Sequence, residues 1–235
     1  MSMDNIKRGP GTGDRGPESR RKVWLAGYRP VAIAAILIVL AGCSILGGKQ
    51  KEPTTLYAPD PRVQADPSWP SVDWQLSISR PEAARMVDSL RIAVRPTPDE
   101  LQVYKGAAWA KTPSDMVEDS ILRALEDSGK ISAVARQGSG IAADYKLVMD
   151  LRRFESDYSG GTPSATIELN VKLLHSAGGQ DVVASRTFVQ SVPASSTAVA
   201  DVVDAFSRGL GQEAHDIAGW TLVNGDQHQR VGHKK

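Results

Sequence analysis

Residues 143–192 carry the pattern that most restricts the fold of this chain. Apolar side chains alternate with mostly polar ones along two stretches, 145–151 and 167–173. This period of two residues is typical of strands with one buried face and one solvated face. Glycine-containing turns separate these stretches from each other and from a third stretch at 182–192. The segment is therefore predicted to be an antiparallel meander, with a β-bulge at Arg152-Arg153 that returns Phe154 to the buried face.

Four shorter strands are predicted nearer the N-terminus. We expect them at residues 74–78, 90–94, 101–104 and 131–136. Pro96 and Pro98 are expected to end the second of these strands, and Lys105-Gly106 the third. Residues 80–83 are expected to start a short helical turn, because proline favours the first helical position.

Two helices complete the pattern. The first is predicted to follow a cap at Thr112 or Ser114 and to end at Ser128-Gly129. The second is predicted over 196–219, capped by Ser195 or Ser196 and weakened by two glycines in its middle. Grouped strands with two segregated helices indicate an α+β fold, a mostly antiparallel sheet with two main helices packed on one face.

The longest apolar run, Val31–Ala41, has eleven residues, whereas a bilayer span needs about 20. A basic stretch precedes the run, as in a secretory signal peptide. The run leads into Leu40-Ala41-Gly42-Cys43, which resembles the bacterial lipobox without a mismatch. The resemblance implies cleavage between Gly42 and Cys43, lipidation of Cys43, and anchoring by acyl chains. The alternative is a buried core cysteine after a core helix.

Ser44 follows this cysteine where an Asp would retain a lipoprotein in the inner membrane of enteric-type bacteria. We therefore expect the periplasmic face of the outer membrane, with the inner membrane as the alternative. The stretch "SRRKVWL" also resembles a twin-arginine signal, although the usual Phe is missing. Export by the general secretory route and export by the twin-arginine route both remain open.

The expected organisation has four parts. They are a signal peptide at 1–42, a lipidated N-terminus with a proline-rich tether at 43–73, a domain at 74–221 and a disordered tail at 222–235. Tyr57, Trp69 and Trp74 leave open that part of the tether packs on the domain. Residues 1–42 hold seven Lys and Arg against three Asp and Glu, so the remainder is mildly acidic. That charge argues against a nucleic-acid partner.

The sequence offers no pattern that predicts catalysis. Two of the four histidines, His228 and His233, fall in the expected tail, and no pair has metal-ligand spacing. The one cysteine is assigned to lipid, and the glycine-containing stretches at 138–140 and 159–161 lie between strands rather than before helices. We therefore expect no enzyme, no metal and no cofactor.

Residues 103–113 form the most distinctive short stretch. Tyr104 and Trp109 stand on either side of a glycine, with Lys105 beside the tyrosine. Tyrosine and tryptophan often anchor interfaces, so these three residues are the candidate partner-binding set. The alternative is that Trp109 covers the core beneath the first helix.

The order of segments from about Trp74 to Trp220 resembles the ABC-type transport auxiliary lipoprotein family. Asp88-Ser89 before "RIAV", the Tyr104…Trp109 stretch and "LEDSG" at 125–129 carry the resemblance. It implies a non-enzymatic lipoprotein partner of an ABC permease and ATPase that work with an MCE-domain substrate-binding protein. Such systems move phospholipid or related lipids between the two membranes.

Two other functions stay open. An envelope assembly or structural lipoprotein would share the lipobox and a small α+β domain. A stand-alone lipid carrier would need a pocket lined by the apolar faces of the long strands, including Leu147, Met149, Ile167, Leu169 and Val171. Those side chains are more simply explained as the core beneath the helices.

Overall fold

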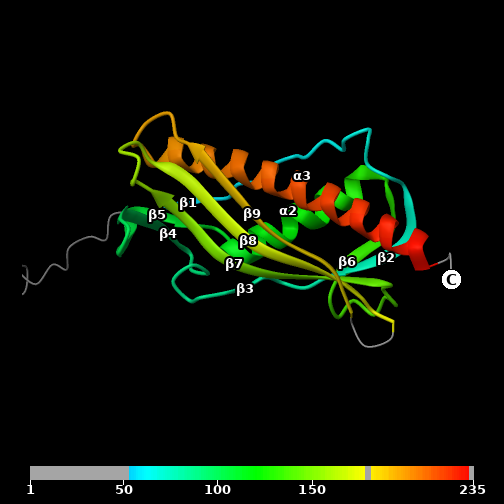
Figure 1. Ribbon diagram of the computed structural model, residues 1–235. Helices are drawn as coiled ribbons and strands as arrows, with labels where there is room; N and C mark the ends of the chain where they lie inside the picture. Colours follow the sequence, from blue (N-terminus) through cyan, green and yellow to red (C-terminus); the bar gives the residue numbers. More distant parts are fainter. Residues whose placement is uncertain (1–52, 178–180, 233–235) are drawn as a thin grey trace, which may run out of the picture. The chain divides into compact units, whose positions relative to one another are not determined.

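The computed structural model describes residues 53–177 and 181–232. Within them, nine strands form one sheet, and two helices, α2 and α3, pack on one face of it (Figure 1). The elements are β1 (Thr55–Tyr57), β2 (Val72–Ile78), β3 (Glu82–Ala83), β4 (Arg91–Thr97), β5 (Glu100–Trp109), α2 (Pro113–Ser128), β6 (Ile131–Arg136), β7 (Tyr145–Asp157), β8 (Ser164–His175), β9 (Asp181–Pro193) and α3 (Val199–Gly232).

The long strand β7 organises the sheet. On one side it pairs with β8, which pairs with β9, and both pairings are antiparallel. On the other side β2, β3 and β4 pair in turn with successive parts of β7, and all three run parallel to it. Beyond these, β6 pairs with β2 and β1 with β5 in parallel, whereas β4 and β5 are antiparallel.

The α+β class is confirmed, but the expectation of a mostly antiparallel sheet is wrong, because five of the eight strand pairings are parallel. The meander over β7, β8 and β9 was visible because its strands are joined by short turns. The parallel pairings join segments that are distant in sequence, such as β2 and β6, whose paired residues Leu76 and Val134 lie on either side of β3, β4, β5 and α2 in the chain. Local alternation carries no information about which distant strand becomes a neighbour.

The meander has the predicted register. The ladder between β7 and β8 slips between Leu151 and Arg153, which is the predicted bulge, and Phe154 returns to the buried face. The inward residues of β7 and β8 are almost fully buried and pack with the apolar side of α3. They include the five residues that a lipid-carrier pocket would need: Leu147, Met149, Ile167, Leu169 and Val171.

The ends of α2 confirm the predicted caps. The Thr112 side-chain oxygen accepts a hydrogen bond from the backbone N–H of Asp115, and Pro113 occupies the first turn. Gly129 adopts a left-handed conformation, with φ 61°, at the C-terminal end. Most residues pay a conformational penalty there, so glycine is the natural choice.

The helix α3 is longer than predicted and includes most of the expected disordered tail. It begins at Val199, where Ser196 Oγ accepts a hydrogen bond from Ala198 N, and it continues to Gly232. Residues 222–232 are therefore helical, and Leu222 in this part is fully buried. The polar sequence of this segment hid the contacts that hold its last turns against the sheet.

Glycines in α3 allow close approach of large side chains. A Cβ on Gly219 would lie 2.5 Å from Trp69 Nε1, and a Cβ on Gly225 would lie 2.9 Å from Trp74 Cε2. Both tryptophans are buried. These glycines weaken an isolated helix, yet in this fold they form the notches that receive the two indole rings.

Three local predictions need correction. Residues 82–83 pair with the middle of β7 as β3 instead of starting a helical turn. Strand β4 continues past Pro96 to Thr97. Pro96 lies where the pairing of β4 with β5 is irregular, so its missing N–H does not interrupt a regular ladder. Strand β5 resumes after a wide bulge at residues 104–107, where Gly106 has φ 67°, and continues to Trp109.

The expected tether at 43–73 is also only partly correct. Its residues 43–52 lie outside the described part of the chain. From Thr55 onward the chain packs on the domain, because β1 pairs with β5 and Trp69 is buried against α3. We call residues 58–71 the strap, since they run along α3 between β1 and β2 (Figure 1).

Candidate functional site

The three candidate partner-binding residues lie in different environments. Trp109 is 1 % exposed and packs edge-on against Phe154 and Phe206, with ring centroids 5.8 and 5.2 Å away. Of the two roles left open for Trp109, its burial supports the role in the core beneath the first helix. The sequence placed Trp109 in a connecting loop, whereas it ends strand β5 and points into the core.

Tyr104 and Lys105 lie in the bulge of β5. The hydroxyl of Tyr104 is 3.1 Å from Ser156 Oγ and 3.0 Å from the hydroxyl of Tyr158. Burial raises the pKa of Tyr104 above its ordinary value, so the phenol stays protonated and can donate. Lys105 is exposed at the surface of the same bulge. The structure thus brings a fixed tyrosine and an exposed lysine to one end of the sheet.

A charged network stiffens this end of the sheet. Glu155 is 2 % exposed and pairs with Arg95 through both oxygens, at 2.6 and 3.0 Å, and with Arg153 at 2.7 Å. Arg153 also reaches Asp157 at 2.6 Å. Burial alone would raise the pKa of Asp157, but hydrogen bonds from Ser159 and the ion pair with Arg153 lower it. A buried carboxylate held by two guanidinium groups fixes the register of β4 against β7.

The Asp88 of the sequence motif anchors the start of α2. Asp88 Oδ1 accepts a hydrogen bond from Ser114 N at 3.0 Å, and its other oxygen pairs with Arg80 at 2.8 Å. Arg80 also donates to Asp115 and to Thr112. A carboxylate beside the first N–H groups of a helix satisfies donors that have no partner within the helix. The motif therefore has a structural role in this chain.

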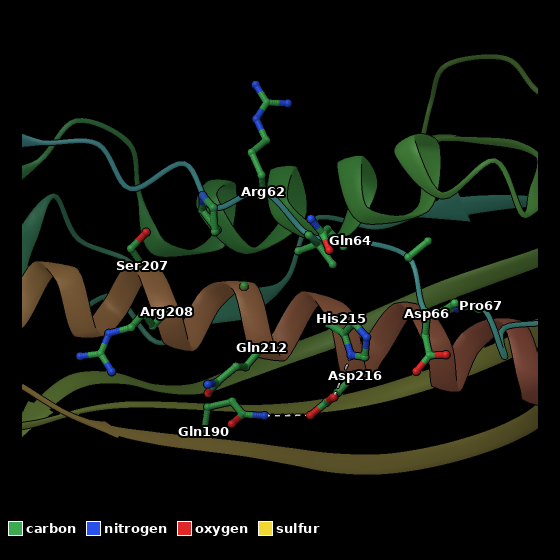
Figure 2. Close-up of a pocket in the computed structure, with 14 residues that line it drawn as sticks. Arg62, Gln64, Asp66, Pro67, Gln190, Ser207, Arg208, Gln212, His215 and Asp216 are labelled. Carbon is green, nitrogen blue, oxygen red and sulfur yellow. Dashed lines mark hydrogen bonds and ion pairs between the residues drawn. The ribbon is translucent and has the colours of Figure 1, made fainter.

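A cleft with a volume of about 820 Å³ lies between the strap and α3 (Figure 2). The strap contributes Arg62, Gln64 and Asp66, and α3 contributes Arg208, among others. Figure 2 shows Arg208 toward one end of the cleft and Asp66 toward the other. Pro61 and Val63 of the strap line the cleft as well, so its lining mixes charged, amide and apolar groups.

Strand β9 reaches the same cleft. The Gln190 amide donates to Asp216 at 3.0 Å, so it joins β9 to the outer side of α3. His215 lies beside Asp216, with His215 Nδ1 3.3 Å from the Asp216 carboxylate, and packs on the ring of Trp69.

A buried carboxyl group lies on α3 near this cleft. Glu213 is 1 % exposed, and neither of its carboxyl oxygens makes a hydrogen bond of ordinary geometry within the described residues. Burial, and then the nearby Asp216 charge, raise the pKa of Glu213 to about 8, although the Gln190 amide lowers it slightly. Glu213 is therefore mainly protonated at neutral pH. Sequence reasoning missed this group because a Glu in a helix usually faces solvent.

The predicted lipidation site lies outside the described residues. Gly42 and Cys43 both precede residue 53, so cleavage and lipidation remain predictions from the lipobox. In residues 53–177 and 181–232, neither helix combines the length and apolar character that crossing a bilayer requires. Over the same residues, no group of three or more His, Cys, Asp and Glu side chains is arranged to hold a metal ion.

Comparison with known proteins decides the family. The family of ABC-type transport auxiliary lipoprotein components matches residues 55–218. This chain belongs to that family. The match covers all nine strands, α2, and α3 as far as Ala218, and it includes the strap, which was expected to lie outside the domain.

Similar proteins support the fold and carry little functional information. A crystal structure of protein XCC0632 from Xanthomonas campestris is 57% identical, with a TM-score of 0.73, and covers 75% of this chain and 99% of that one. A crystal structure of an uncharacterized protein, 15% identical with a TM-score of 0.56, covers 71% of this chain and 97% of that one and shares the fold. The uncharacterized protein bll6063 of Bradyrhizobium diazoefficiens is 27% identical over 157 residues, which is 67% of this chain but only 42% of that relative.

Proposed function

We propose that this chain is a lipid-anchored, non-catalytic docking subunit of an MCE-type ABC transporter that moves lipid between the two membranes. The family match over residues 55–218 carries the association with an ABC transporter. The lipobox at Cys43 supplies the anchor, at the periplasmic face of the outer membrane. The partners would be an MCE-domain substrate-binding protein and, through it, the permease and ATPase.

The packing of the domain supports docking more than lipid carriage. The five side chains that would have to line a carrier pocket are at most 2 % exposed and fill the space beneath α3. A phospholipid acyl chain would have to displace packed core to enter the domain, which would cost several kcal/mol for each large side chain removed.

We place the docking surface at the end of the sheet that carries Tyr104 and Lys105. Lys105 is exposed there, and Tyr104 lies beside it with its hydroxyl fixed by Ser156 and Tyr158. The buried Glu155 network keeps this end rigid, which lowers the entropy lost when a partner binds. Trp109 contributes by holding the inner side of β5 against the core.

Site-specific photocrosslinking in native envelopes tests this placement. A photoreactive residue at Lys105 is expected to crosslink to an MCE-domain protein. A matched probe at Lys172, which is exposed on β8, is expected to give little crosslinking to that protein. Equal crosslinking from both positions would contradict the docking surface, and crosslinks only to envelope-assembly proteins would contradict the proposed function.

A further inference from the structure

The end of α3 brings together aromatic and imidazole rings from four elements. Trp74 of β2, Tyr145 of β7, His175 of β8 and His228 of α3 line one cleft of about 390 Å³, together with Asp144. The ring centroids of Trp74 and Tyr145 are 4.8 Å apart, and those of Tyr145 and His175 are 5.2 Å apart. No metal site was expected from the sequence, partly because His228 falls in the segment predicted to be a disordered tail.

The two imidazoles lie at a separation that suits a shared metal ion. The ring centroids of His175 and His228 are 4.9 Å apart, with their planes inclined by 56°. A metal bound at about 2.0–2.1 Å to one nitrogen of each ring, in tetrahedral geometry, places the two centroids roughly 5 Å apart. We propose that His175 and His228 form a two-imidazole site for a divalent transition metal, with Zn²⁺ as the expected ion.

The second nitrogen of His228 already has the partner that such a ligand needs. His228 Nδ1 lies 3.0 Å from the Tyr145 hydroxyl, which in turn lies 3.4 Å from the Gly225 carbonyl oxygen. With Nε2 bound to metal, Nδ1 carries the proton and donates it to the Tyr145 oxygen. The tyrosine hydrogen then points to the Gly225 carbonyl. Such a chain fixes the tautomer and the ring orientation of a metal-binding histidine.

The remaining ligands are water, which makes this a site of moderate affinity. No third His, Cys, Asp or Glu in the described residues completes a metal-binding group with these two. Asp144 lines the same cleft, and one of its oxygens accepts a hydrogen bond from Gln75 N. Its negative charge favours a cation in the cleft without a direct bond to the metal. Imidazole ligands suit Zn²⁺, Ni²⁺ and Cu²⁺.

Metal binding would join α3 to the sheet. His175 ends β8, whereas His228 lies in the last turns of α3. Polar contacts also join these turns to the sheet, such as the Gln229 amide, which donates to Asp73 at 3.0 Å. One ion bound by both histidines therefore ties the end of the helix to the end of the strand. The last turns of α3 should exchange their amide hydrogens more slowly with the metal bound.

The test is Zn²⁺ titration by calorimetry of the full-length lipoprotein in nonionic detergent, without a histidine tag. We expect one ion per chain, at least tenfold weaker binding in His175→Ala and in His228→Gln, and unchanged binding in the matched control His215→Ala. Tyr145→Phe keeps the ring packing and removes the hydroxyl, and it should weaken binding about tenfold. Circular dichroism verifies that each variant is folded.

The outcomes separate the site from a purely structural aromatic cluster. If no Zn²⁺ binds to the wild-type chain, or if binding survives in the double variant of His175 and His228, the inference is wrong. Hydrogen exchange gives a second measurement that does not depend on substitution. Slower exchange at residues 226–232 on addition of Zn²⁺ supports the site, and unchanged exchange there contradicts it.

Discussion

Glu213 should make the stability of this protein fall as the pH rises toward 8. Its carboxyl group is buried without a hydrogen bond of ordinary geometry, and burial raises its pKa from 4.5 to about 8. Below pH 4.5 both the folded and the unfolded states hold the proton, so the group does not oppose folding. As the pH rises from 4.5 to 8, only the folded state keeps the proton, and stability is lost progressively.

The size of the effect follows from the shift in pKa. One pKa unit corresponds to 1.36 kcal/mol, so a shift from 4.5 to about 8 amounts to about 5 kcal/mol when the full range is crossed. Glu213→Gln removes the titrating group and keeps nearly the same shape. Between pH 5 and pH 8 the variant should therefore gain about 3–5 kcal/mol relative to the wild-type chain.

Urea unfolding of both proteins at a series of pH values measures this difference. Taking the difference removes the contributions of other groups, such as Asp88, Asp119 and Asp157, whose lowered pKa values favour stability above the acid range. Glu126→Gln is a matched control on the exposed side of α2 and should leave the profile unchanged. If the Glu213→Gln profile runs parallel to that of the wild type, the buried carboxyl is ionised or solvated and the reasoning fails.

Three further predictions concern packing and capping. Trp109→Ala should destabilise the domain by about 3–5 kcal/mol in urea unfolding. Trp109→Phe should cost less, because it keeps an aromatic ring and removes an indole N–H that has no hydrogen-bond partner among the described residues. Equal losses would argue against the core role. Gly219→Ala should cost about 1–3 kcal/mol by crowding Trp69, and combining it with Trp69→Ala should abolish that additional cost in a double-mutant cycle. Asp88→Asn should weaken the bonds to Ser114 and Arg80, lower the free energy of unfolding by about 1–3 kcal/mol, and so lower the melting temperature. An unchanged melting temperature would exclude this anchoring role.

Local sequence patterns predicted the parts of the fold that depend on local physics. The caps at Thr112 and Gly129 and the bulge before Phe154 all lie where the structure has them. Each depends on interactions between residues that are adjacent in sequence or joined by a short turn. The buried faces of the long strands were correct for the same reason.

The failures share the opposite property. The helical tail is held by Leu222 and by the notch at Gly225 for Trp74, and neither contact can be read from the polar sequence around it. Trp109 was placed on a loop because Gly106 suggested the end of a strand, whereas the glycine instead allows a bulge within β5. Burial of Glu213 also depends on long-range packing, between α3 and the sheet, which a single sequence does not reveal.

The candidate site was predictable only in part. The family resemblance and the role of residues 103–113 as a distinctive stretch came from the sequence, and the family is confirmed by the match over 55–218. The cleft beside the strap and the pair of His175 with His228 form where segments far apart in the chain pack together. The spacing of residues within a motif does not predict such long-range contacts.

Purification of the lipoprotein from detergent-solubilised native envelopes, with identification of its partners by mass spectrometry, tests whether the chain is a subunit of an MCE-type ABC transporter. We expect an MCE-domain protein and an ABC ATPase to purify with the wild-type chain. Lys105→Glu, at the proposed docking surface, should reduce their recovery more than Lys172→Glu does. Recovery of barrel-assembly components instead, or of no partner at all, would show that the chain does not dock such a transporter.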